Sequence, residues 1–246
     1  ALTEEVGENT NSIVDQLKSM FQSRLSGTHA SIELRLQSVS LLWRSETMKR
    51  QQLATVLMKS SLEAWHFTSI HNPAFGVRSR NYGLIPQSEK EIEKWYTLSV
   101  ELCLTMIESK SQFSNTVKVI LASKLRGIWT KARLFTLVES VCKRIIFTEY
   151  WGQGWFKILT IIKYDANKES EDIKERLLTL ELSLRPKNIY EEVRAFLFSG
   201  ATGSDLSEVF NMDDGKKGFE NIVYGFEKLG TRLAVNTEIF NFLLPE

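Results

Sequence analysis

The chain has 246 residues, of which 43% are hydrophobic and 25% are charged, so it can bury a sizeable core as one large or two small domains. Its formal net charge of +1 excludes a protein that binds polyanions over its whole surface. The two cysteines exclude a disulfide framework, and no apolar run approaches the roughly 18 residues of a membrane span. We therefore expect a cytoplasmic, reduced protein with no membrane contact.

Residues 1–72 predict an N-terminal helical portion. Apolar side chains recur at three- and four-residue spacing from Ile13 to Leu25, from Ile32 to Trp43, and from about Ser45 to Phe67. Trp65 lies on the third of these stripes. We expect three helices packed as one bundle.

Residues 73–87 interrupt the helical pattern. Two prolines and two glycines in this short span forbid a continuous helix. The same span keeps Tyr82 beside Arg78 and Arg80, which favours a loop packed on the surface over a loose one. We predict that these three side chains contact a partner protein.

Residues 88–198 predict central helical hairpins. Ser88 and Glu91 form a capping box, which indicates a helix start. Further helices are expected over about 114–129 and 134–145, joined by a short link that makes them antiparallel neighbours. Two more follow, one ending near Tyr164 and one before Pro186, and Asn188 caps a shorter one. The helix that Ser88 opens should bury one face, made of Ile92, Trp95, Tyr96, Val100, Cys103, Met106 and Ile107.

Aromatic residues gather at a corner, Tyr150 to Trp155, that contains two glycines. We expect these glycines to let two helices turn beneath bulky rings, with Trp155 in the core. Beyond the central hairpins, residues 199–218 are rich in glycine and acidic residues and predict a mobile loop. Residues 219–246 predict C-terminal helices.

Motifs for chemistry are weak. Glu63 and His66 have the Glu-x-x-His spacing of di-iron bundles, but no second copy of the motif occurs. A phosphate-binding loop would require a Lys-Ser/Thr pair after Gly203, where Ser204-Asp205 stands instead. Neither a nucleophile elbow nor a cysteine-protease signature is present. We expect no catalytic residues, no cofactor and no metal, and hence no enzyme.

The sequence has one local charge anomaly, between Ser109 and Val138. Six basic residues occur there before the first acid, Glu139, and Trp129 among them could stack on a base. This set makes a nucleic-acid-binding module the alternative function. A solvated helix face, neutralised by the acidic stretches 169–181 or 205–214, is the other account of it. The basic residues are Lys110, Lys118, Lys124, Arg126, Lys131 and Arg133.

Four stretches between residues 75 and 200 carry a resemblance to a known family. They read FGVRSRNYGLIPQSEKEIEKWY, KLRGIWTKARLFTLVESVCKRI, EYWGQGWFKILTIIKYD and LRPKNIYEEVRAFLFSG. This region resembles helical C-terminal parts of large bacterial STAND-type ATP-binding proteins, some of which act in antiphage (antiviral) defence. The resemblance implies a helical sensor or scaffold that is part of a larger bacterial protein. It carries no nucleotide-binding motif and no functional residue.

Together these observations predict an all-α fold, a multi-helix bundle of αα-hairpins with solenoid-like character. The expected function is non-catalytic recognition or scaffolding through a protein partner, with nucleic-acid binding through residues 110–133 as the alternative.

Overall fold

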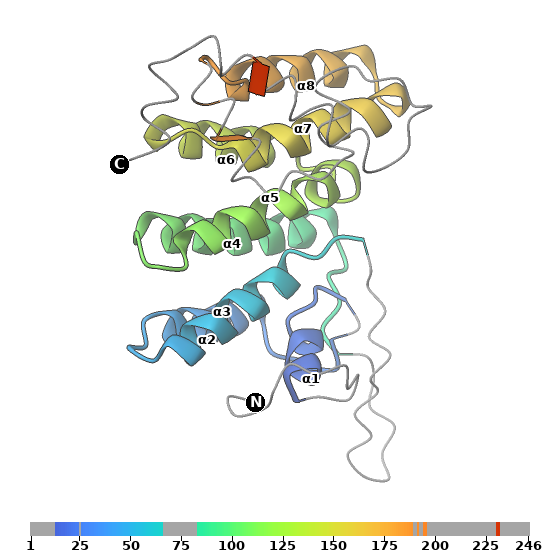
Figure 1. The fold of residues 1–246 in the computed structure, drawn as a ribbon. Coiled ribbons are helices and arrows are strands. Elements are labelled where there is room, and N and C mark those ends of the chain that lie inside the picture. Colours follow the sequence, from blue (N-terminus) through green and yellow to red (C-terminus); the bar gives the residue numbers. More distant parts are fainter. Residues whose placement is uncertain are drawn as a thin grey trace, which may run out of the picture. The chain divides into compact units, whose positions relative to one another are not determined.

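The computed structural model describes residues 13–24, 26–65, 83–188, 191, 194–195 and 230–231. Within these ranges all regular structure is helical, which confirms the all-α class (Figure 1). No helix in the described ranges is both long and apolar enough to cross a membrane. The helices are α1 (Ile13–Met20), α2 (Ile32–Trp43), α3 (Met48–Ser61), α4 (Glu89–Glu108), α5 (Ser114–Thr130), α6 (Phe135–Thr148), α7 (Gly152–Tyr164), the 3-10 helix η1 (Ala166–Lys168) and α8 (Glu171–Leu184).

The chain divides into two compact units, Ala1–Val141 and Cys142–Glu246. The division falls within α6, inside the stretch 88–198 that the sequence suggests as one run of hairpins. Each unit has its own buried apolar side chains.

In the first unit, helices that follow one another in the sequence pack side by side. Helix α2 packs on α3 and α4, and α4 packs on α5 (Figure 1). Short links join α2 to α3 and α4 to α5, which explains why these two pairs of helices lie side by side. The core includes several side chains that are almost completely buried, namely Tyr96, Met58, Leu62, Met106, Leu121, Leu125, Ile128 and Trp129.

The start of α4 confirms the predicted capping box. The Ser88 hydroxyl oxygen accepts a hydrogen bond from the Glu91 backbone N–H at 3.3 Å, and the Glu91 carboxylate accepts one from the Gln87 N–H at 2.6 Å. In the usual capping box the glutamate binds the N–H of the N-cap residue itself. Here it binds the N–H of Gln87, the residue before the N-cap Ser88. The predicted apolar face is also confirmed, because Trp95 and Cys103 are each at most 2% exposed.

A buried arginine fixes the link between α1 and α2. Arg35 is 3% exposed, and its guanidinium donates to the carbonyl oxygens of Ala30 at 2.9 Å and Gln22 at 2.8 Å, and to the Ser26 hydroxyl at 3.1 Å. It also lies 5.0 Å from the centre of the Trp95 ring. Burial lowers the pKa of Arg35 to about 10, so it stays charged at neutral pH. This clamp positions the segment that follows α1 near α4.

Helix α3 is shorter than predicted. It ends at Ser61, whereas the apolar pattern predicted a helix as far as Phe67, which lies outside the described residues. The Glu63 carboxylate accepts the backbone N–H groups of Ala64 and Trp65, each at 3.1 Å, and these bonds compete with a helical ladder. As a result Trp65 lies past the helix with 39% of its surface exposed.

In the second unit, α7 packs on α8 and η1. Trp155 is 5% exposed, which confirms its predicted core position. Its indole N–H donates to Glu181 Oε1 at 2.8 Å, and Arg185 holds the same carboxylate through Nε at 2.9 Å and Nη2 at 2.6 Å. A buried tryptophan, a buried carboxylate and an arginine thus join α7 to the end of α8.

The two glycines at the aromatic corner have a different role from the one predicted. They lie in the first turn of α7, not in the link before it. A Cβ atom on Gly154 would lie 2.3 Å from the Trp151 indole, and one on Gly152 would lie 2.9 Å from Ala195 Cα. Close packing of a ring and of a neighbouring segment, and not a turn, therefore requires glycine here. The corner is not wholly core, because nearby Phe147 is 91% exposed.

Candidate functional site

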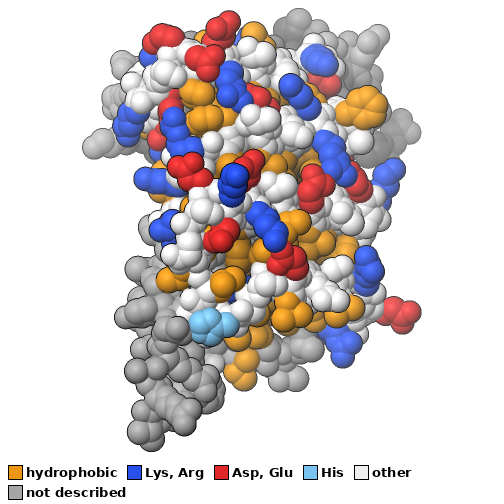
Figure 2. All heavy atoms as spheres, turned by 180° about the vertical axis from the view of Figure 1, so that it is seen from behind, with side chains coloured by type: hydrophobic (Ala, Val, Ile, Leu, Met, Phe, Trp, Pro, Cys, Tyr) orange, Lys and Arg blue, Asp and Glu red, His pale blue; other side chains and the backbone are white. Residues whose placement is uncertain are grey.

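The basic residues predicted from the sequence lie in the C-terminal part of the first unit. Lys118, Lys124 and Arg126 are on α5, and Lys131 and Arg133 follow its end. On the face seen in Figure 2, Lys and Arg side chains alternate with Asp and Glu. The three predicted partner-binding residues, Arg78, Arg80 and Tyr82, fall outside the described residues.

Trp129 does not fit the base-stacking role proposed for it. Its side chain is 0% exposed and packs edge-on against Phe135, with ring centroids 4.7 Å apart. A ring with no accessible face cannot stack on a nucleobase in this conformation. The sequence prediction was wrong on this point because the apolar face of α5 contains Trp129 together with the neighbouring core residues.

Lys124 is paired inside the fold. Its ammonium lies 2.5 Å from Glu63 Oε2, and the two side chains are 13% and 21% exposed. Burial would raise the pKa of Glu63, but the Lys124 hydrogen bond and the backbone N–H groups of Trp65 and Ala64 outweigh it and lower this pKa. The Glu63 carboxyl is therefore ionised at neutral pH. The acidic residue that neutralises Lys124 is thus Glu63, just after α3. The sequence pattern had suggested an acid from the stretches 169–181 or 205–214 instead.

The pairing also accounts for the glutamate of the Glu-x-x-His motif. Glu63 lies past the end of α3, so the motif has no helical geometry at this residue, and His66 is outside the described residues. The carboxylate of this non-helical residue binds Lys124 of α5. Within the described ranges, no group of three or more His, Cys, Asp or Glu is arranged to hold a metal ion.

Two further basic residues surround Trp65. Arg126 Cζ lies 5.3 Å and Lys131 Nζ lies 4.7 Å from the ring centroid, both within the range of cation–π attraction. A Cβ atom on Gly127 would lie 2.8 Å from Trp65 Cδ1. The absence of a side chain at this position of α5 therefore lets the indole rest against the helix.

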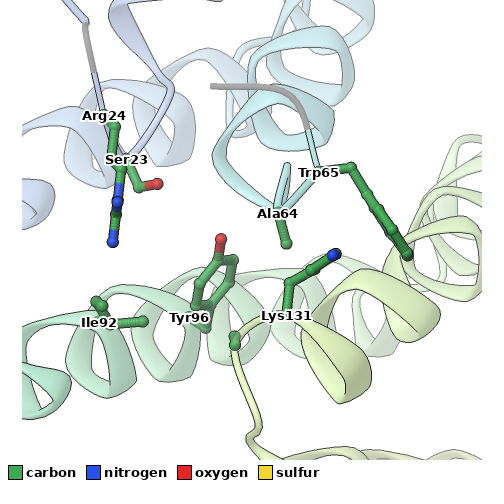
Figure 3. A pocket seen from close by; sticks show the side chains of 8 residues that line it. Ser23, Arg24, Ala64, Trp65, Ile92, Tyr96 and Lys131 are labelled. Carbon is green, nitrogen blue, oxygen red and sulfur yellow. The ribbon is translucent and has the colours of Figure 1, made fainter. Parts of the chain in front are cut away.

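A pocket of about 280 Å³ opens beside this tryptophan (Figure 3). Four separate segments build it: the residues after α1, the residues after α3, helix α4, and the end of α5. Figure 3 shows Arg24 on one side of Tyr96 and Lys131 on the other. The lining residues are Ser23, Arg24, Ala64, Trp65, Ile92, Tyr96, Lys131 and Ala132.

Tyr96 forms the floor of this pocket and has a structural role there. Its hydroxyl donates to the Glu63 carbonyl oxygen at 2.8 Å. Burial, with a smaller contribution from the negative charge of Glu63, raises the pKa of Tyr96 to about 12, although a hydrogen bond with Ser23 and the charge of Arg24 act in the opposite direction. The phenol therefore stays protonated, far from the pKa near 7 that suits a general acid or base.

The pocket carries positive charge. Arg24 and Lys131 line it, and none of its described lining residues is acidic. The carboxylate of Glu63, the residue before Ala64, is bound by Lys124 and two backbone N–H groups. In the described part of the chain, Lys131 has no ion-pair partner, and its ammonium contacts the Trp65 ring.

The structure thus brings together one part of the predicted basic set, Arg126 and Lys131, and adds residues that sequence reasoning missed. The sequence pattern placed Trp65 and Tyr96 on the apolar faces of predicted helices, and it did not single out Arg24. The signal available for Trp65 was its position after Glu63, a residue able to bind the backbone that follows it.

No protein-family model matches the sequence, and searches of curated proteins and of solved structures found no similar chain.

Proposed function

We propose that this chain is a non-catalytic helical recognition module that binds a partner protein, and that the pocket beside Trp65 is its contact site. The observation that carries this proposal is the composition of the pocket, where an exposed tryptophan, a tyrosine and an arginine meet. Trp, Tyr and Arg are the residues most enriched where protein interfaces gain most of their binding energy.

The pocket is also held rigidly before any partner arrives. Trp65 rests on Gly127 beneath two cations, and Tyr96 is fixed by its hydrogen bond to the Glu63 carbonyl. The Arg35 clamp fixes the segment that carries Ser23 and Arg24. A site whose side chains are already ordered loses less conformational entropy on binding, which favours affinity.

Nucleic-acid binding by residues 110–133 has less support. Trp129 is buried, Lys124 is paired with Glu63, and Lys118 has an interaction partner in the chain. Non-specific nucleic-acid binding depends on several cations that each neutralise a phosphate, and few of this set are available for it.

We also propose that the module is part of a larger bacterial protein in which it acts as a sensor or scaffold. This proposal is supported by the resemblance of residues 75–200 to helical regions of STAND-type ATP-binding proteins. The resemblance rests on the four sequence stretches alone and assigns no role to any residue of the pocket.

An affinity capture from bacterial lysate tests the function. The immobilised 246-residue chain is incubated with lysate that has or has not been treated with nuclease, and retained proteins are identified by mass spectrometry. Each candidate is then purified and titrated into the chain by calorimetry. A saturable complex between the two purified proteins supports the proposal. Retention that disappears after nuclease treatment, with no binary complex, would overturn it in favour of nucleic-acid binding.

A further inference from the structure

We propose that the exposed face of α8 is a self-complementary surface through which two copies of this chain pair, with their α8 helices antiparallel. This face lies in the second unit, so the inference goes beyond the proposed function and is independent of it. It is carried by two exposed leucines, by the spacing of the residues around them and by the charges at the two ends.

Helix α8 exposes two leucines one turn apart. Leu178 is 53% and Leu182 is 61% exposed. Residues four apart lie on the same face of a helix, so the two side chains form one apolar patch, and removing this patch from water against a matching surface is favourable. The packed side of the helix is separate from the patch, and its buried residues are Ile173, Leu177, Leu180, Glu181 and Leu184.

Charged residues flank this patch symmetrically. Glu175 precedes Leu178 by three residues, and Arg185 follows Leu182 by three residues. Because the leucines are four apart, the spacing reads the same from either end of the helix. A second α8 turned end to end therefore sets each Leu178 against a Leu182, and each Glu175 against an Arg185. A parallel pair in the same register would set like charges together instead, which is unfavourable.

The two charged side chains are placed to reach a second copy. Glu175 is exposed, and its carboxylate has no hydrogen bond or ion pair within the described part of the chain. Arg185 has 57% of its side chain exposed and binds Glu181 through Nε and Nη2, which among the described residues leaves Nη1 open to another acceptor. The bond to Glu181 also holds the guanidinium in one orientation, so less conformational entropy is lost when a carboxylate of a second copy binds it.

The size of the face sets the strength of the pairing. Helix α8 has 14 residues, fewer than the roughly 20–30 residues that each side of a standard stable interface contributes. Interfaces below about 1,200 Å² belong mostly to weak, transient complexes. We therefore expect a reversible equilibrium in which dimer forms as the concentration rises, and not an obligate dimer.

Sedimentation equilibrium of the intact chain tests the pairing, at concentrations from about 5 to about 500 μM. We expect the average mass to rise with concentration from that of one chain towards that of two. Leu178→Glu and Leu182→Glu should each raise the dissociation constant about tenfold or more, because a carboxylate would be buried at the centre of the interface. Glu175→Lys should raise it about three- to tenfold. The matched control is Leu41→Glu, which should leave the constant unchanged, because Leu41 is 66% exposed on α2 in the first unit.

Cysteine crosslinking tests the antiparallel arrangement. The native cysteines, Cys103 and Cys142, are buried, so cysteines introduced on the surface react in their place. Chains with Leu178→Cys and chains with Leu182→Cys, each with its own affinity tag, are mixed and oxidised. We expect the mixed disulfide in well above the share that random pairing gives, because the antiparallel register brings these two positions together.

The outcomes separate this inference from the proposed function. Circular dichroism first confirms that each variant keeps its helix content. If the wild-type chain stays monomeric over the whole range, or if Leu178→Glu, Leu182→Glu and Glu175→Lys associate as wild type does, the inference is wrong. A monomeric wild type whose melting temperature falls on either Leu→Glu change would show that α8 is covered by another part of the chain. Crosslinks mainly between identical positions would overturn the antiparallel arrangement. The capture of a partner protein does not depend on α8, so the proposed function stands or falls separately.

Discussion

Replacing Trp155 by alanine should destabilise the second unit by about 3–5 kcal/mol. The side chain is only 5% exposed, and aromatic side chains of this kind bury roughly 150–250 Å², which at about 25 cal/mol per Å² corresponds to about 4–6 kcal/mol of transfer free energy as an upper bound. The lost indole hydrogen bond to Glu181 should add little, because Arg185 still holds both carboxylate oxygens. Urea unfolding followed by circular dichroism measures the change without depending on tryptophan fluorescence.

Two further variants divide this effect into its parts. Trp155→Phe keeps most of the ring but removes the N–H donor, so it should reduce the free energy of unfolding by about 1–2 kcal/mol. Phe147→Ala is the matched control, because Phe147 is 91% exposed and its loss should change stability by less than about 0.5 kcal/mol. A Trp155→Ala variant that loses less than about 1 kcal/mol would refute the assignment of this ring to the core.

Three further predictions concern the first unit. The Glu63 carboxyl has a lowered pKa in the folded chain, so the stability advantage of wild type over Glu63→Gln should be largest at neutral pH. This advantage should shrink as the pH falls below the ordinary pKa of 4.5. Urea unfolding between neutral and acidic pH measures the difference, and a difference that stays constant would contradict the prediction. Gly83→Ala should destabilise by about 1–3 kcal/mol, because φ is +84° and the added Cβ would lie 2.6 Å from backbone atoms of Thr28. Its control is Gly230→Ala in the second unit, where no described atom lies within 4 Å of the added Cβ; this change should be neutral or slightly stabilising in thermal melts. Arg35→Lys should destabilise by about 2–4 kcal/mol in urea unfolding, because an ammonium cannot reach all the buried acceptors that the guanidinium binds; wild-type stability would mean that the clamp is not needed.

Apolar periodicity predicts the helices of this chain well where packing and local signals agree. Helix α4 is an example, since Ser88 caps it and its apolar face is buried as expected. Helix α2 is another, because Ser31 lies at its N-cap and Trp43, the last residue of the apolar stripe, is its final residue. In both cases the periodicity of 3.6 residues and the capping chemistry specify the same boundaries.

The same periodicity failed at the end of α3, for a physical reason. Trp65 continues the apolar stripe, so the pattern alone extends the helix through it. The Glu63 side chain binds the next two backbone N–H groups, and its other oxygen is held by Lys124 from a helix distant in the sequence. The local competitor is visible in the sequence, but the partner that stabilises it is not, because the contact joins residues that are far apart along the chain.

The candidate site depends on the early end of α3. Had α3 continued to Trp65, the indole would have been on the buried face of the helix, as the sequence predicted. Because the helix ends early, the ring instead lies on Gly127, where Arg126 and Lys131 reach it and where it forms a wall of the pocket. The ion pair of Glu63 and Lys124 is therefore the interaction on which the geometry of the pocket depends, and we expect changes to either residue to alter binding as well as stability.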